Sequence, residues 1–571
     1  MYDHHPSSPD SFYSAVQSPE KPASDHEMTD VNDTPVPAKR YRPSKSPARE
    51  IQQHCHIFFD ESLYHSALSL LSDLVTAGAS HPDCLNRPAI TPIPFHIELV
   101  SALLIHPRWT THLLQNESAD LPARAITLLR NILSILGPIN ANLGEAFSFS
   151  EPERHRPMRG GRPRHVAEAD TGSSSSEEER PDRMLGVIAN GGRLRRCAKD
   201  FWHVVGWAFN CSVKYPKRWQ YWKVWLEFMF DVLHEDYEER KRLDLEKHER
   251  DGRRPNQDPE YSMLRNSLLL EYLVHVKGRT SALKRVARSI FANGQEASLR
   301  EFPEVYPNET RVPKDEQGQK RKREDSMQEA NFGDYNDEMG DDAFESPKSS
   351  LSDDEGEEPE ADLLLGGTES IALRQCIVKL LSQATADISE EFTDTVEYFD
   401  SIYECTKVLP NPAFSLFLSP SRTSQLPVVV QISLIQLSLL RLLPNNAPIP
   451  AKVLGRSRDE VTQEVLEKCY LPFPAMTSSV DDNTKLSILI ENIFRIYVKQ
   501  DGECYHTPVL DHAIEKGIKA RENKIKDDRK KKSAQARKRD DADRAMMRAS
   551  AERLRSLFKW IEHKNLAHRR A

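Results

Sequence analysis

Apolar side chains recur at every third or fourth position along most of the chain, which is the spacing of one face of a helix. In the first part of the sequence this pattern predicts helices over 51–74, 95–105, 109–115 and 123–136. Gly78 and the pair Gly137–Pro138 end two of these helices, because both residue types interrupt helical structure. Strict alternation of apolar and polar positions occurs only in stretches too short to build a sheet. The pattern therefore predicts an all-α fold.

A tryptophan-rich block carries the most distinctive helical pattern. Five of the seven tryptophans lie between Trp202 and Trp225, and Pro216 separates two amphipathic helices there. Indoles spaced three residues apart on one face pack a helix–helix core, each burying about 200 Å². Four cations lie among them: Lys214, Lys217, Arg218 and Lys223. Because aromatic rings also stack on bases while cations hold phosphates, nucleic-acid binding is the alternative; we favour the core.

The helical pattern continues in both halves of the chain. Further helices are predicted over 235–253, 263–276, 282–291, 371–381, 392–408, 428–443, 461–469 and 486–497. The helix 428–443 is apolar nearly all round, which predicts a central buried helix. No repeat of roughly 30–50 residues aligns along the chain. The predicted fold is a set of irregular helical blocks, which resemble HEAT-like or bundle scaffolds in general architecture only.

A long basic helix is predicted over residues 508–571, because no Pro follows Pro508 and no Gly follows Gly517. Its middle, 530–544, has no apolar stripe, so this part is expected to project into solvent. Four apolar residues then restore an amphipathic tip: Leu554, Leu557, Phe558 and Ile561. This tip either docks into a groove of a partner or folds back on the chain's own body.

Charged stretches separate the helical blocks. The most acidic one, 324–362, holds sixteen carboxylates and a single lysine, Lys348. Such stretches cannot bury enough apolar surface to fold, so they are predicted to be disordered linkers. The predicted organisation is a disordered tail (1–49), a helical block (50–150), a disordered RGG and acidic linker (151–183), a Trp-rich helical block (184–296), a disordered acidic linker (297–367), a third helical block (368–507) and the basic helix (508–571).

The N-terminal tail contains two motifs of the form Ser-Pro-x-Lys/Arg, which begin at Ser18 and Ser46. Proline-directed cell-cycle kinases prefer this form, which predicts phosphorylation of both serines. Each phosphate would add about −1.5 to −2 charges and partly cancel the basic residues nearby. The alternative is a solvated, unstructured tail without a regulatory role.

Targeting signals favour the nucleus. Basic clusters at 37–45, 320–323 and 530–539 fit nuclear-import signals. The eight cysteines include no C-x-x-C pair, which is typical of reduced thiols in the cytosol or nucleus. The first residues lack the basic and apolar regions of a signal peptide, and the longest apolar run, 428–443, is too short and too polar to span a bilayer. We therefore expect a nuclear protein without a membrane partner.

The C-terminal cations are the candidate contacts for nucleic acid or for a protein partner. They are Lys530, Lys531, Lys532, Arg537, Lys538 and Arg539. Each phosphate that such residues neutralise steepens the salt dependence of binding to DNA or RNA. An Arg-Gly-Gly-Arg segment at 159–162 is a second, weaker candidate for contact with a nucleic-acid backbone.

Recognisable catalytic chemistry is absent from the sequence. There is no Walker loop, no G-x-S-x-G and no H-E-x-x-H. His54, Cys55 and His56 are possible metal ligands, but adjacent helical residues point about 100° apart and cannot easily share one ion. We predict no catalytic residue, no metal site, no cofactor and no small-molecule substrate.

These observations favour a nuclear, non-enzymatic scaffold or adaptor. Its expected setting is a chromatin or chromosome-maintenance complex, with other nuclear proteins as partners. The alternative is direct nucleic-acid binding through the basic C-terminal helix, as in an RNA-processing or ribosome-assembly factor. An unrecognised helical enzyme is a third hypothesis, which no motif supports.

Overall fold

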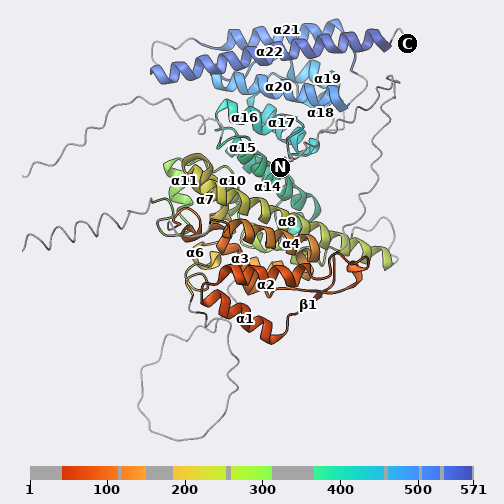
Figure 1. The fold of residues 1–571 in the computed structure, drawn as a ribbon. Helices are drawn as coiled ribbons and strands as arrows, with labels where there is room; N and C mark the ends of the chain where they lie inside the picture. The colour runs from red at the N-terminus through yellow and green to blue at the C-terminus, as the bar shows by residue number, and fades with distance from the viewer. Residues whose placement is uncertain are drawn as a thin grey trace, which may run out of the picture. The chain divides into compact units, whose positions relative to one another are not determined.

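The computed structural model describes residues 41–113, 119–149, 184, 186–251, 259–311, 365–454, 461–500, 504–526 and 533–568 (Figure 1). The tail up to residue 40, the linker 151–183 and residues 312–364 of the predicted acidic linker 297–367 lie outside these ranges. Residues 297–311, at the start of that predicted linker, are instead folded, with Phe302, Val305 and Tyr306 buried. Within them the chain forms twenty α-helices and one two-stranded sheet, which confirms the predicted all-α class. None of these described helices is long and apolar enough to cross a membrane.

The first block consists of α1 (Arg49–Asp60), α2 (Tyr64–Thr76), α3 (Pro94–Ile105), α4 (Leu121–Asn140) and α5 (Leu143–Phe147). The predicted helix 51–74 is divided in two because Ser62 adopts a left-handed backbone, with φ 58°. Gly137 interrupts α4 where the sequence predicts a helix end, because its backbone is not helical and has a φ of 72° that favours glycine. The helix predicted over 109–115 is not formed in its described part; a 3-10 turn at Pro107–Trp109 comes in its place.

Residues 41–49, which the sequence assigns to the disordered tail, belong to the folded unit. The strand β1 (Ser44–Lys45) pairs in parallel with β2 (Ala89–Ile90). Arg42 is buried, and its guanidinium donates a hydrogen bond to the carbonyl oxygen of Arg87 at 3.1 Å. The predicted boundary of the tail is therefore wrong. Composition could not reveal it, because the acceptors that hold this segment come from distant parts of the chain.

The Trp-rich block contains α6 (Leu194–Cys197), α7 (Phe201–Lys214) and α8 (Pro216–Arg250). Five tryptophans are at most 8% exposed: Trp202, Trp207, Trp219, Trp222 and Trp225. The indole N–H of Trp202 donates to the carbonyl oxygen of Tyr272 at 2.9 Å, and that of Trp225 donates to Ser101 Oγ at 2.9 Å. Buried rings cannot stack on bases, so the core interpretation is confirmed.

Carboxylates on the charged half of α8 hold the segment that follows it. Asp244 is buried and accepts hydrogen bonds from the backbone N–H groups of Met263 and Leu264, at 2.9 and 2.8 Å. Asp236 accepts one from the backbone of Leu268 at 2.8 Å. The next helices are α9 (Leu268–Leu273), α10 (Thr280–Ile290) and α11 (Glu296–Glu301). The charged end of α8 is thus a structural element as well as a solvated surface.

The described residues beyond the acidic linker form α14 (Thr368–Asp387), α15 (Thr395–Thr406), α16 (Asn411–Leu418), α17 (Val428–Leu442), α18 (Pro450–Leu454), α19 (Gln463–Val465), α20 (Val480–Gln500), α21 (Pro508–Lys524) and α22 (Ala534–His568). The helix α14 packs against α8 and α10. Arg374 of α14 also donates a hydrogen bond to the carbonyl oxygen of Ala292, just after α10, at 2.9 Å. The helices before and after the acidic linker therefore share one core.

The helix α17 is not the fully buried helix that its composition predicts. Leu434 and Ile435 are buried on the side that packs against α15 and α20. On the other side, the side chain of Val429 is 73% exposed and that of Leu440 is 58% exposed. Apolar residues all round a helix are compatible with burial and with an exposed apolar face, and the sequence alone does not separate the two.

The predicted C-terminal helix is divided into two helices. α21 ends before Ile525, which has an extended backbone, and α22 begins at Ala534, while 527–532 lie outside the described residues. α22 is an extended basic helix of 35 residues, as predicted, but it packs along α20. Gly517 lets α21 lie close to the backbone at Leu471, which precedes α20, because a Cβ at position 517 would overlap the carbonyl oxygen of Leu471. Figure 1 shows α20, α21 and α22 side by side.

Candidate partner-binding site

Two cavities lie against α20, the helix that contacts α16, α17, α21 and α22. Each is partly open to solvent and has a volume of about 260 Å³. We name the first the tyrosine cavity; it is lined by Tyr403, Lys407, Val408, Phe414, Ser438, Leu442, Asp482 and Lys485. We name the second the arginine cavity; it is lined by Ser415, Ser419, Glu491, Asn492, Arg495, Met546, Ala549 and Arg553. Both are therefore built from residues far apart in the sequence.

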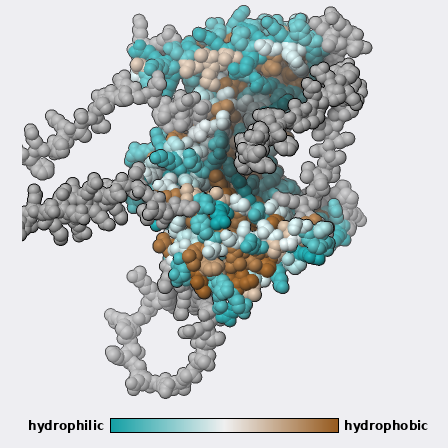
Figure 2. Space-filling model, in the orientation of Figure 1, coloured by the Kyte–Doolittle hydropathy of each residue, from teal (hydrophilic) through white to brown (hydrophobic). Residues whose placement is uncertain are grey.

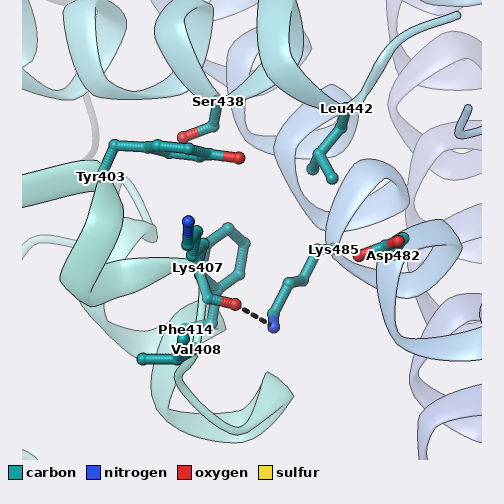
Figure 3. A pocket seen from close by; sticks show the side chains of 8 residues that line it. All are labelled: Tyr403, Lys407, Val408, Phe414, Ser438, Leu442, Asp482 and Lys485. Carbon is teal, nitrogen blue, oxygen red and sulfur yellow. Dashed lines mark hydrogen bonds between the residues drawn. The ribbon is translucent and has the colours of Figure 1, made fainter. Parts of the chain in front are cut away.

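The tyrosine cavity lies between four helices, as Figure 3 shows. The ring of Tyr403, from α15, lies across the cavity from Phe414 of α16, and Leu442 of α17 closes the side between them. Lys485 enters from α20. Two aromatic rings, aliphatic side chains and a cation thus surround one space, which suits an apolar side chain that carries or adjoins a polar group.

The ammonium group of Lys485 is fixed in the wall of the tyrosine cavity. Lys485 is 4% exposed, and its Nζ donates hydrogen bonds to the carbonyl oxygen of Lys407 at 2.6 Å and to Asp481 Oδ2 at 2.8 Å. The same nitrogen lies 5.7 Å from the centre of the Phe414 ring, within the range of a cation–π contact. This cation is therefore neutralised locally and positioned by three helices.

The phenol of Tyr403 is a hydrogen-bond donor at neutral pH. Burial raises the pKa of Tyr403, while the positive charge of Lys407 opposes that shift. The ammonium of Lys407 lies 5.9 Å from the centre of the Tyr403 ring and also pairs with Glu404 at 2.6 Å. The cavity thus offers a protonated hydroxyl beside an apolar space.

Exposed apolar side chains gather in the same part of the chain. Of the eighteen large hydrophobic residues that are exposed among the described residues, seven lie within 396–449: Val396, Val408, Leu416, Val428, Val429, Leu440 and Ile449. Val408 lines the tyrosine cavity and is 72% exposed. Val429 and Leu440 are about three helical turns apart and share the outer face of α17. The exposed side chains of Val429 and Leu440 therefore leave apolar surface of α17 open to solvent, and such surface can mark an interaction site.

The predicted cationic contacts lie at the beginning of α22. Arg537, Lys538 and Arg539 are exposed, whereas Lys530–Lys532 lie outside the described residues. Figure 2 shows mainly hydrophilic residues over α21 and α22 on the face in view. The exposed cations of α22 are thus accessible to solvent on the side away from its packed face. The Arg-Gly-Gly-Arg segment 159–162 also lies outside the described residues.

The apolar tip of the C-terminal helix is not a free docking face in this structure. Leu554, Phe558 and Ile561 are at most 8% exposed, and Leu557 is half-buried. The ring of His506 stacks on that of Phe558 with centroids 4.3 Å apart. Of the two alternatives for this tip, the structure therefore has the one in which it folds back on the chain's own body.

The remaining candidate residues are not brought together into a site. Ser46 is exposed beside the buried Pro47, while Ser18 lies outside the described residues. His56 packs its ring against that of His96, with centroids 4.8 Å apart. Among the described residues, no group of His, Cys, Asp or Glu is arranged to hold a metal ion.

No protein-family model matches this chain, and no curated protein matches it significantly. The residues that line the two cavities were not among the predicted site residues. One local signal was available for Lys485, a lysine that precedes the apolar run of α20 and follows an acidic residue, Asp481, by one helical turn. No local signal pairs Lys485 with Tyr403, because the two line one cavity only when α17 packs against both α15 and α20.

Proposed function

We propose that the protein is a nuclear, non-enzymatic helical adaptor that binds a partner protein through the tyrosine cavity and the exposed apolar residues of 396–449. The observation that carries this proposal is the concentration of exposed apolar side chains there. Its setting, on the basis of the nuclear-import clusters, is a chromatin or chromosome-maintenance complex. The basic clusters 320–323 and 530–532 support nuclear entry. The cluster 37–45 supports it less, because Arg42 is buried and hydrogen-bonded.

The energetics favour an apolar anchor on the partner. Complete burial of a valine or leucine side chain is worth about 1.5–3 kcal/mol. Val408 and Leu440 both leave most of their surface to water in the unbound chain. Aromatic and aliphatic anchors that fill a pocket dominate the affinity of protein interfaces, while their surroundings exclude water. We expect the partner to place such an anchor between Tyr403 and Phe414.

Capture of partners by the full-length protein tests the proposal. We expect proteins that co-purify stoichiometrically from nuclei with the wild-type chain to be lost from the variants Val408→Asp and Leu440→Asp. A buried carboxylate without a partner would cost several kcal/mol in the complex, whereas both side chains are exposed in the free protein. A thermal melt should therefore give the same Tm for the variants and the wild type.

The matched control is Val274→Asp. Val274 is 63% exposed but lies outside 396–449, so this variant adds the same charge at a similarly exposed valine. We expect it to retain all partners. Retention of every partner by Val408→Asp and Leu440→Asp would remove the support for this surface.

Direct nucleic-acid binding is a second candidate function. The exposure of Arg537, Lys538 and Arg539 in consecutive positions of α22 favours it. Asp540 and Asp541 follow at once, however, and reduce the local positive charge. The adaptor function remains the better supported of the two, because it uses an exposed apolar surface that nucleic acid would not bury.

A further inference from the structure

The arginine cavity is a built polar site on the other side of α20. Its walls come from the end of α16, from α20 and from α22. At its base lies the carboxylate of Glu491, which is 3% exposed. Met546 and Ala549 of α22 supply apolar wall, and Ser415 and Ser419 supply hydroxyl groups.

Two guanidinium groups converge on the carboxylate of Glu491. Its Oε1 accepts hydrogen bonds from Arg495 Nη2 and from Arg553 Nε, both at 2.6 Å. Its Oε2 accepts one from Arg553 Nη2 at 2.8 Å. One negative charge therefore faces two positive charges, and the cavity retains a net charge of about +1 at neutral pH.

Several donors in the arginine cavity have no acceptor among the described residues. Within the described ranges, Arg495 donates only from Nη2, and Nη1 of Arg553 has no acceptor. Asn492 is 4% exposed, and its Nδ2 is buried without a hydrogen-bond partner in the described structure. A buried donor left unpaired destabilises the free protein, so an acceptor that bonds to Asn492 would remove that penalty.

We propose that the arginine cavity binds one carboxylate side chain, Asp or Glu, from an acidic segment of a partner protein. The carboxylate accepts hydrogen bonds from the unused nitrogens of Arg495 and Arg553 and from the amide of Asn492. The methylene groups of the same side chain lie against Met546 and Ala549. The proposal rests on the adaptor function and gives the partner a second, acidic contact.

Charge complementarity selects a carboxylate as the ligand. A single carboxylate neutralises the excess positive charge of the cavity, whereas a phosphate dianion would leave a net negative charge beside Glu491. The planar, bidentate geometry of a guanidinium also matches a carboxylate. Arg553 already binds one carboxylate, that of Glu491, in this geometry, and Arg495 donates a single hydrogen bond to it.

Binding of a fluorescent hexaglutamate peptide to the full-length protein tests the proposal, with hexaglutamine and hexaphosphoserine peptides for comparison. We expect hexaglutamate to bind most tightly of the three. The variant Asn492→Leu should weaken that binding at least tenfold, because it removes one donor to a charged group. It should not lower Tm, because leucine fills a similar volume and removes a buried unpaired donor.

The control variant is Lys538→Gln, which removes an exposed cation of α22 outside the cavity. We expect it to change hexaglutamate binding less than twofold. Equal binding by wild-type and Asn492→Leu protein, or tighter binding of hexaphosphoserine, would overturn the carboxylate assignment. The variant Val408→Asp should bind hexaglutamate as the wild type does, so failure of the tyrosine cavity as a partner site is distinguishable from failure of this proposal.

Discussion

Arg553 of α22 donates two hydrogen bonds to the carboxylate of Glu491 on α20, from Nε to Oε1 at 2.6 Å and from Nη2 to Oε2 at 2.8 Å. The two residues are 62 positions apart, so this bidentate pair ties the end of the chain to its helical body. One turn away on α22, Ser550 Oγ donates to the carbonyl oxygen of Ser487 on the same α20 face, at 3.0 Å. The C-terminal helix is therefore a part of the fold.

The variant Leu554→Ala tests this arrangement. Leu554 is 0% exposed on the face of α22 that packs along α20. Truncation of a fully buried leucine costs about 2–5 kcal/mol, because apolar contacts are lost and a cavity is left. We expect urea denaturation to report a loss of that size in the free energy of unfolding.

Trp560→Ala is the matched control for Leu554→Ala. Trp560 is larger than leucine but is 51% exposed on the same helix. We expect its truncation to cost less than that of Leu554, despite the greater number of atoms removed. If Trp560→Ala proved the more costly of the two, the packed face of α22 would have to be a different one.

Arg374 provides a second stability prediction. It is 0% exposed and, among the described residues, has no carboxylate partner; burial lowers its pKa to about 9. Its guanidinium lies 4.1 Å from the centre of the Phe209 ring and donates to the carbonyl oxygens of Ile290 and Ala292. Those carbonyls end α10, so Arg374 joins the helices on either side of the acidic linker.

We expect Arg374→Met to lower the free energy of unfolding by about 2–4 kcal/mol. Methionine keeps much of the packing against Phe209 but leaves two buried carbonyl oxygens without a donor. Denaturation followed by tryptophan fluorescence measures the change. Arg300→Met is the control, because Arg300 is exposed and, in the part of the chain that the structure describes, pairs only with Glu296 on its own helix. An equal effect of the two substitutions would contradict the structural role of Arg374.

Periodicity was sufficient for most of the helices. It predicted α3 over 95–105, and it placed the tryptophans of α8 in a core because Trp219, Trp222 and Trp225 recur at a three-residue spacing. It did not predict the break between α1 and α2, which is caused by the left-handed φ of one residue, Ser62. The spacing of apolar residues does not reveal such a turn, because it does not depend on the backbone conformation of one residue.

The residues of the candidate site could not be predicted from local sequence patterns, for a different reason. The exposed side of α17 depends on which helices cover it, and Leu434 and Leu440 are equally hydrophobic in the sequence. Asn492 and Arg553 share a cavity only because α22 folds back on α20. Long-range packing decides both outcomes, whereas spacing along one helix describes only neighbours within a few turns.

Two buried histidines predict the pH dependence of stability. Burial lowers the pKa of His96 to about 3 and that of His106 to about 4, compared with 6.5 for an exposed ring. His106 Nδ1 also accepts a hydrogen bond from the backbone N–H of Arg108 at 3.2 Å, which requires a neutral ring. Below pH 6.5 the unfolded chain takes up protons at these rings and the folded chain does not. Stability is therefore full above pH 6.5 and is lost as the pH falls towards 4.

The double variant His96→Phe, His106→Asn should lose less stability than the wild type between pH 7 and pH 5. Each histidine contributes a slope of up to about 1.4 kcal/mol per pH unit, and neither new side chain titrates in this range. The free energy of unfolding, measured by urea titration at each pH, gives the two slopes. The control His54→Gln removes an exposed imidazole and should retain the wild-type slope. Equal slopes for the double variant and the wild type would show that His96 and His106 are protonated in the folded state.

The salt dependence of nucleic-acid binding separates the two proposed functions. Lys538 is exposed at the start of α22, but Asp540 and Asp541 follow it, so we expect the full-length protein to bind a 20-base-pair duplex weakly at low salt. Each phosphate contact contributes a slope of about −0.9 in a plot of log affinity against log salt, so an affinity that rests on a few contacts falls rapidly as salt is added.

The variant Lys538→Glu should reduce that slope by about the contribution of one contact. Lys559→Glu, at the far end of α22, serves as the charge-matched control. Fluorescence anisotropy over a salt series measures both. Tight binding that persists at physiological salt and depends on Lys538 would favour direct nucleic-acid binding over the adaptor function. Binding of a partner protein does not require a contact between Lys538 and a duplex.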